Sequence, residues 1–300
     1  MPSSRLPDRR LGYTAIYDPI QIILRHAAKD LTPTPGFRTN YLGVKVDVDR
    51  FFPNLKIGKG VESAPIPANW HTDLAEFSAA LRAVENAGRD FTMIELGCGW
   101  GCWMNITGAA ARRAGKRARL ISVEGDEGHV GFARDSLTEN GFAEDQFIVH
   151  HGIVGPREGV AFFPRQSHAG VKWGLEPVIG PSPEDARRLR ASGAFSELPM
   201  LSLRDVAEGR ARIDLLHIDI QGGEVDFVRS CMEELNRVVA YVLVGTHSRA
   251  IDGELARAFT ESGRWTLEIE RPTFYSNVDG VLTTLVDGVQ GWRNRSFDAK

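Results

Sequence analysis

Apolar and polar positions follow two periods along the chain, one typical of buried strands and one typical of amphipathic helices. Short apolar runs predict strands at 91–96, 118–123, 146–150, 212–219 and 238–244. Apolar residues spaced three or four positions apart predict helices at 72–87, 103–115, 128–140, 224–235 and 252–263. This alternation predicts an α/β fold, with a mostly parallel sheet flanked by helices.

The ends of the chain depart from this alternation. Strands at 265–270 and 281–286, joined by the turn-forming Asn277-Val-Asp-Gly280, predict a closing strand pair. We interpret residues 70–290 as the main domain and 291–300 as a tail. Residues 1–69 form an N-terminal extension, which we expect to pack on the main domain or on a partner chain.

Composition excludes several classes of protein. The chain has 300 residues, of which 42% are hydrophobic and 25% charged, as in ordinary soluble proteins. A net charge of −3 gives no electrostatic reason to expect a nucleic-acid partner. No run of about 18 apolar residues predicts a membrane span, and the N-terminus does not resemble a signal peptide. Three cysteines do not suggest a disulfide framework, so we expect a cytoplasmic protein.

A glycine-rich turn follows the first predicted strand of the main domain, in the stretch Glu95-Leu-Gly-Cys-Gly-Trp-Gly-Cys102. Glycines tolerate positive φ and let a ligand approach the backbone, and the next helix points free N–H groups at that ligand. A dinucleotide fingerprint needs the spacing G-x-G-x-x-G. Cys102 stands where its third glycine would fall, which disfavours a Rossmann oxidoreductase.

Polar residues also follow the other predicted strands, at the sheet edge where α/β proteins bind ligands. Glu124-Gly-Asp126 ends the second strand, at the position of an acid that binds ribose hydroxyls. Gly152 and Ile153 follow the third strand, where an adenine ring would lie. Asp219 and His247 end the last two parallel strands, so we expect them to overhang one cleft.

Two motifs resemble known methyltransferases. The E-x-G-x-G-x-G stretch from Glu95 resembles motif I of S-adenosylmethionine-dependent methyltransferases. Ile213-Asp-Leu-Leu-His-Ile-Asp-Ile-Gln-Gly-Gly-Glu224 is similar to the FkbM family signature I-D-L-L-K-I-D-V-E-G-A-E, and Leu198-Pro-Met-Leu-Ser-Leu-Arg-Asp-Val resembles the approach to it. The similarity covers about residues 90–287, and it departs from the signature at His217, Gln221 and Gly223.

The resemblance implies a Rossmann-like class I methyltransferase sheet, with an antiparallel last strand, that binds S-adenosylmethionine. FkbM-type enzymes are mostly O-methyltransferases acting on hydroxyls of sugars, glycans and secondary metabolites, which implies a small-molecule or glycan acceptor. The expected cofactor-binding residues are Glu95, Gly97, Cys98, Gly99, Gly101, Glu124, Gly125, Asp126, Gly152, Ile153 and Asp219.

Methyl transfer to oxygen needs a group that accepts the hydroxyl proton. We expect His247 and Asp219 to be the catalytic residues, with His247 as the base because histidine accepts a proton near neutral pH. Asp219, Glu224 and His247 could instead hold Mg²⁺. This alternative is not favoured, because Mg²⁺ prefers oxygen ligands and only one carboxylate is well placed.

Residues 155–200 interrupt the α/β alternation with many glycines and prolines. A connection this long is usually functional or mobile. Phe162, Phe163 and Trp173 favour a lid over the acceptor, and a surface insertion is the alternative. A catalytically silent cofactor-binding or scaffold protein with the same fold also stays open, as does a homo-oligomer.

Overall fold

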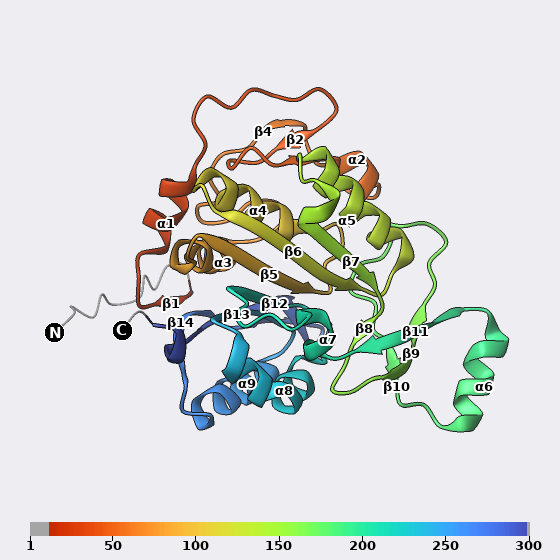
Figure 1. Ribbon diagram of the computed structural model, residues 1–300. Helices are drawn as coiled ribbons and strands as arrows, with labels where there is room; N and C mark the ends of the chain where they lie inside the picture. The colour runs from red at the N-terminus through yellow and green to blue at the C-terminus, as the bar shows by residue number, and fades with distance from the viewer. Residues whose placement is uncertain (1–11, 299–300) are drawn as a thin grey trace.

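The computed structural model describes residues 12–298 and centres on an eight-stranded sheet (Figure 1). Its strand order is β1-β14-β17-β13-β12-β5-β6-β7. The members are β1 (Thr14–Ala15), β14 (Trp265–Arg271), β17 (Gly288–Asn294), β13 (Tyr241–Thr246), β12 (Leu215–Ile218), β5 (Asp90–Leu96), β6 (Arg117–Glu124) and β7 (Phe147–His151). The strands from β13 to β7 are parallel, and β17 runs antiparallel to β13. The predicted mostly parallel sheet with an antiparallel last strand is confirmed.

Helices cover both faces of this sheet (Figure 1). One face carries α3 (Leu74–Asn86), α4 (Cys102–Arg113) and α5 (Glu127–Glu139), with the short η1 (Glu144–Gln146) after them. The other carries α7 (Leu203–Ala207), α8 (Glu224–Val238) and α9 (Arg249–Glu261). Successive strand residues point to opposite faces, so Met93 packs with the first set of helices and Ile94 with the second. This explains why the central strands read as continuous apolar runs.

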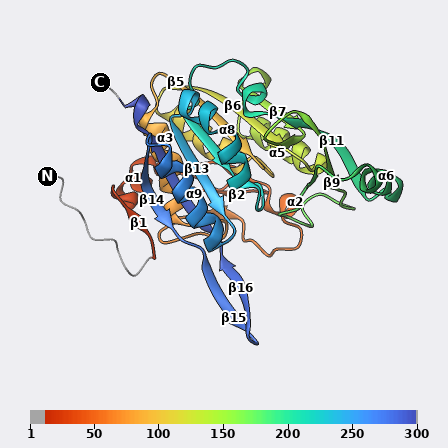
Figure 2. The same ribbon diagram turned by 90° about the horizontal axis from the view of Figure 1, so that it is seen from below.

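The closing strands differ from the prediction. β17 (Gly288–Asn294), rather than 281–286, lies between β13 and β14, so residues 291–294 of the expected tail belong to the sheet. A β-carbon on Gly291 would lie 2.6 Å from Oη of Tyr241. Position 291 therefore needs glycine, whereas a strand is recognised in a sequence by its apolar side chains. The apolar β16 (Val281–Val286) pairs only with β15 (Phe274–Val278), in an exposed hairpin that projects from the body (Figure 2).

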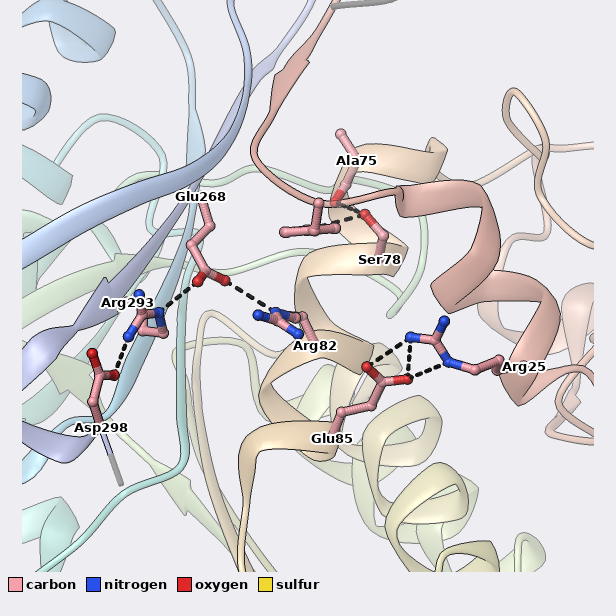
Figure 3. A network of polar contacts seen from close by, with 9 residues as sticks. Arg25, Ala75, Ser78, Arg82, Glu85, Glu268, Arg293 and Asp298 are labelled. Carbon is pink, nitrogen blue, oxygen red and sulfur yellow. Dashed lines mark hydrogen bonds and ion pairs between the residues drawn. The ribbon is translucent and has the colours of Figure 1, made fainter. Parts of the chain in front are cut away.

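The N-terminal segment, from residue 12 onward, packs against the main domain. β1 pairs with β14, and α1 (Pro19–His26) lies beside α3, where Arg25 makes an ion pair with Glu85 at 2.8 Å (Figure 3). Near this contact, the buried Glu268 binds Arg82 and Arg293, which ties α3 to the sheet. The rest of the segment has only short elements, namely β2 (Arg38–Thr39), β3 (Lys45–Val46), α2 (Val48–Phe51) and β4 (Gly60–Val61).

The 155–200 insertion has structure of its own. It forms most of a four-stranded sheet of order β10-β9-β11-β8, beside the edge strand β7 (Figure 1). The elements are β8 (Ile153–Val154), β9 (Gly159–Pro164), β10 (Val178–Ile179), α6 (Pro183–Ser192) and β11 (Phe195–Leu201), and the chain closes with η2 (Arg295–Phe297). Among residues 12–298, no helix is both long and apolar enough to cross a membrane.

Candidate functional site

A cavity of 650 Å³ lies at the carboxyl ends of β5, β6 and β12, where parallel α/β sheets bind ligands. The predicted cofactor residues that line it are Gly97, Gly99, Glu124, Gly125, Asp126, Gly152, Ile153 and Asp219. These residues lie on four separate connections of the chain, and the sheet brings them to one edge. We refer to this space as the cofactor cavity.

The glycine turn forms the floor of the cofactor cavity. Gly97, Gly99 and Gly101 all have positive φ, between 54° and 77°, which glycine adopts without strain. A β-carbon on Gly97 would lie 2.0 Å from the carbonyl oxygen of Asp219. Glycine is therefore required at position 97 both by the turn and by the close approach of the loop after β12.

Glu124 holds the turn in place from the end of β6. Its Oε2 accepts a hydrogen bond from the N–H of Gly99 at 2.8 Å, and its Oε1 accepts one from the N–H of Asp126 at 2.8 Å. Burial raises the pKa of this carboxyl, and the two N–H groups oppose the rise. A carboxylate has about four acceptor positions, so Glu124 can still accept hydrogen bonds from ligand hydroxyls.

Glu95, Cys98 and Gly101 are not among the residues that line the cofactor cavity. The buried carboxylate of Glu95 instead accepts N–H groups from the first turn of α4, at 2.9 Å from Met104 and 3.3 Å from Trp103. Burial raises the pKa of Glu95 to about 7. Glu95 was expected to contact the cofactor. Its carboxylate instead caps the N-terminus of α4, because both of its oxygens accept N–H groups of that helix.

The far end of the cofactor cavity is apolar. Gly152 and Ile153 lie there, and a β-carbon on Gly125 would lie 2.6 Å from the ring of Phe163. Ile153 and Phe163 belong to a small buried apolar cluster of the second sheet. Gly152 and Ile153 thus line the same cavity as the glycine turn, and their contact with an adenine ring stays a prediction.

The insertion covers the cofactor cavity through Trp173. Its ring stacks on His129 at 4.1 Å and on Phe52 at 4.9 Å between centroids. A β-carbon on Gly99 would lie 2.8 Å from this ring. The insertion was expected over an acceptor, whereas its residues 172–177 line the cofactor cavity.

A second cavity, of 640 Å³, opens beside the first. Its walls come from the loop before α3, from α3 itself, from the ends of β12 and β13, and from the chain leading into β17. We refer to it as the acceptor-side cavity. The residues that carry polar groups into it include His71, Asp73, Glu76, Asp219, His247, Arg271 and Asp287. Among the described residues, Asp219 alone lines both cavities.

His247 lies between two carboxylates. Its Nε2 is 3.2 Å from Oδ1 of Asp219, and its Nδ1 is 3.2 Å from Oε1 of Glu224. Burial alone would lower the pKa of His247, but the hydrogen bonds and charges of the two carboxylates raise it to about 10. The two carboxylates therefore favour the protonated ring, which disfavours His247 as the general base. His247 also bridges the loop after β13 to the loop after β12.

Asp219, Glu224 and His247 bring three potential metal-ligand atoms within 4.8 Å of one another. However, Glu224 already accepts hydrogen bonds from the N–H groups of Ile220 and Gly222, which fold the loop around it. One imidazole and a carboxylate committed to backbone groups suit Mg²⁺ poorly, because it demands six oxygen ligands in octahedral geometry. The donor set therefore agrees with the expectation that Mg²⁺ is not favoured.

A second ionic pair lies at the wall of the acceptor-side cavity, where Glu76 is one of the lining residues. Nε2 of His217, on β12, lies 3.2 Å from Oε1 of Glu76 on α3, and Thr72 donates its hydroxyl to the same carboxylate. Burial alone would lower the pKa of His217, but Glu76 and the carboxylates of Glu95 and Asp219 raise it. The neighbouring carboxylates therefore favour the protonated form of His217.

Sequence reasoning missed the residues that precede α3. Trp70 and His71 line the acceptor-side cavity, although no motif singled them out at the start of the predicted main domain. The only local signal was their position just before the N-cap Asp73, which accepts hydrogen bonds from Ala75 and Glu76. Their approach to Asp219 depends on the packing of α3 on the sheet, which no local pattern encodes.

The strand order, the glycine turn and the cavity at the sheet edge define a class I methyltransferase. The chain is 41% identical over 268 residues to a protein of Jannaschia sp. (strain CCS1) described as "Putative methyltransferase", covering 89% of this chain and 95% of the relative. The chain therefore belongs to this methyltransferase family and is an S-adenosylmethionine-dependent enzyme, which removes the oxidoreductase alternative. No model of a known protein family matches the chain.

Solved structures show more distant similarities. A human methyltransferase 10 domain containing protein has a TM-score of 0.40 and 12% identity, covering 92% of this chain and 98% of that one. A precorrin-6y C5,15-methyltransferase from Geobacter metallireducens GS-15 has a TM-score of 0.38 and 9% identity, covering 73% and 87%. A protein of Pyrococcus horikoshii described as a "putative RNA methyltransferase" has a TM-score of 0.39 and 13% identity, covering 76% and 87%. At these scores, none of the similarities bears on the acceptor.

Proposed function

We propose that this enzyme transfers the methyl group of S-adenosylmethionine to a hydroxyl of a small polyhydroxylated molecule, a sugar, glycan or secondary metabolite. The observation that carries the proposal is that Asp219 lines both cavities. A methyl donor on one side and an acceptor on the other would meet beside this residue. Methyl transfer needs the acceptor oxygen in line with the methyl group at roughly 3–3.5 Å, which a shared wall permits.

In the cofactor cavity, the chain offers a matching group for each part of S-adenosylmethionine. The glycine turn at Gly97 and Gly99 would hold the amino-acid part, where backbone can approach closely. Glu124 would accept hydrogen bonds from the ribose hydroxyls, and the apolar end at Ile153 would hold the adenine. The carboxylate of Asp219 would face the sulfonium end. S-adenosylmethionine supplies an electrophilic methyl group, and these residues orient it and exclude water.

The acceptor class follows from the charges around the second cavity. Asp73 pairs with Arg271, Glu76 with His217 and Asp219 with His247. The paired charges neutralise one another and leave no concentrated positive surface for a polyanion. Polar groups with Trp70 and Trp103 nearby suit a neutral molecule with several hydroxyls. The resemblance of 213–224 to the FkbM signature supports the same class, as it does O-methylation.

Calorimetry and a transfer assay test the proposal. S-adenosylmethionine and S-adenosylhomocysteine should bind to the purified protein, whereas NAD should not. Tritium-labelled methyl should pass from S-adenosylmethionine to a hydroxyl of methyl glucoside, galactoside or mannoside. Binding without transfer to any tested hydroxyl would instead favour a catalytically silent cofactor-binding protein, and transfer to RNA would contradict the acceptor class.

A further inference from the structure

His71, in the loop before α3, has the placement that a proton acceptor for methyl transfer requires. It lines the acceptor-side cavity, together with Asp219 from the cofactor side. The residue comes from the loop before α3 and not from a strand of the sheet. Resting on the proposed function, we propose that His71 is the catalytic base that takes the proton from the acceptor hydroxyl.

The loop around His71 is rigidly built. Oδ1 of Asn69 accepts hydrogen bonds from the N–H groups of His71 and Thr72, both at 2.8 Å, and the N–H of Asn69 returns a bond to the carbonyl of Thr72. The next residue, Asp73, caps α3 and makes an ion pair with Arg271 on β14. The backbone of His71 is therefore fixed from both sides.

His71 is exposed, and its ring contacts neighbouring side chains on two sides. It packs edge-on against Trp70 and Trp100, with centroids 5.3 Å and 6.1 Å away. Its Nδ1 lies 3.9 Å from Sγ of Cys102 at the start of α4. Burial raises the pKa of the Cys102 thiol, so the sulfur stays protonated and can accept the Nδ1–H. Nε2, on the opposite edge of the ring, then keeps its lone pair, and His71 is among the residues that line the cavity.

The charged groups that face His71 come from three elements. Burial lowers the pKa of His71, Glu76 on α3 and Asp219 after β12 oppose that change, and His217 on β12 adds to it. The net direction is downward, which favours the neutral imidazole. This contrasts with His247, whose two carboxylate partners favour its protonated form.

The other titratable groups of this cavity are less suited to accept a proton. Glu76 is bonded to His217 and Thr72, and Asp73 to the α3 backbone and Arg271. Asp219 is bonded to His247 and to Nε2 of Gln221. Asp287 is the remaining rival, because burial raises the pKa of its carboxyl and it lies on the same wall.

The proposed step balances as follows. The acceptor O–H bond breaks and its proton moves to Nε2 of His71, while the oxygen forms a bond to the methyl carbon. The carbon–sulfur bond breaks and its electron pair stays on sulfur, which leaves S-adenosylhomocysteine. The imidazolium of His71 then returns its proton to solvent through the open cavity.

The first test needs no acceptor. Diethyl pyrocarbonate modifies neutral, accessible imidazoles, and peptide mass mapping locates the modified histidines. At pH 6 to 7, His71 should be modified readily and His247 should resist. Resistance of His71 over this pH range would show that it is protonated or shielded, and would overturn the proposal.

The second test compares variants in the transfer assay with methyl glycosides. His71→Gln should lower kcat about 10²–10⁴-fold, the usual effect of losing a general base, and leave the Kd of S-adenosylhomocysteine unchanged. The wild-type rate should fall as pH drops through the lowered pKa of His71, and the variant should lose this limb. His26→Gln, on α1 outside both cavities, is the matched control and should behave as wild type.

Two results would contradict the role of His71. These are a wild-type rate in His71→Gln, or loss of the pH limb in Asp287→Asn with His71→Gln unaffected. Failure of the proposed function is distinct from both. It would appear in the wild-type protein itself, as no binding of S-adenosylhomocysteine or no transfer to any methyl glycoside. In that case the diethyl pyrocarbonate result still decides whether His71 is a neutral, accessible group.

Discussion

Gly97 faces the carbonyl oxygen of Asp219 so closely that a β-carbon on Gly97 would lie 2.0 Å from that oxygen. The contact joins the turn after β5 to the loop after β12. It is a contact between backbones, so no side chain can rotate to relieve it. The two loops that shape the cofactor cavity are thus fixed relative to each other.

Gly97→Ala should therefore damage the cofactor cavity. Overpacking a closely packed contact costs typically about 1–3 kcal/mol in the free energy of unfolding, and a left-handed φ adds to that. We expect weaker S-adenosylhomocysteine binding by calorimetry and a lower midpoint in thermal unfolding. Gly88→Ala is the control, because a β-carbon there has nothing within 4 Å. Equal behaviour of the two variants would argue against this contact.

Glu124→Ala should weaken cofactor binding by about 1.5–3 kcal/mol, the range for hydrogen bonds to a charged group. The hydrogen bonds that Glu124 accepts from Gly99 and Asp126 predict some loss of stability as well. Calorimetry and thermal unfolding separate the two effects. The exposed Glu127 provides the control variant Glu127→Gln. An unchanged Kd in Glu124→Ala would remove Glu124 from the ribose site.

His247 should stay protonated well above neutral pH. Its folded-state pKa of about 10 lies above the ordinary value of 6.5, so its ionic bonds stabilise the fold fully below about pH 6.5 and lose that effect as the pH rises through 10. The difference in unfolding free energy between wild type and His247→Gln should shrink over this range. NMR titration of the imidazole provides the direct measurement. A midpoint near 6.5 would contradict the ionic bridge and restore His247 as a candidate base.

Residues 164–183 should respond to the cofactor alone. Trp173 covers the glycine turn, so S-adenosylhomocysteine should slow amide hydrogen exchange in this stretch without any acceptor. The exposed hairpin β15–β16 serves as an internal reference, because most of it lies outside the cofactor cavity. Protection that appears only with a methyl glycoside would support the original expectation of a lid over the acceptor.

Chelation should leave the enzyme unaffected. Both nitrogens of His247 lie 3.2 Å from carboxylate oxygens, and Glu224 is committed to backbone N–H groups. EDTA should change neither S-adenosylhomocysteine binding nor the transfer rate, and added Mg²⁺ should not stimulate it. A loss of activity with EDTA that Mg²⁺ restores would show that Asp219, Glu224 and His247 hold a metal.

Local patterns predicted the sheet and the position of the cofactor residues. The central strands are buried on both faces, so they appear in the sequence as apolar runs, and a positive-φ turn leaves a trace as glycines. The same reasoning selected β16 as a sheet strand instead of β17. An apolar run indicates a strand but does not show what will cover it, and β17 is buried although it carries glycines and polar residues.

The sequence by itself therefore determined the class of fold, the edge of the sheet where the larger cavity lies, and eight of the residues that line that cavity. Only the tertiary structure decided which groups the polar residues meet. Glu95 caps a helix, His247 lies between two carboxylates, and His71 reaches the acceptor-side cavity from the loop before α3. The physical reason is that a backbone turn is encoded locally, whereas the protonation of a side chain depends on charges and burial contributed by distant parts of the chain.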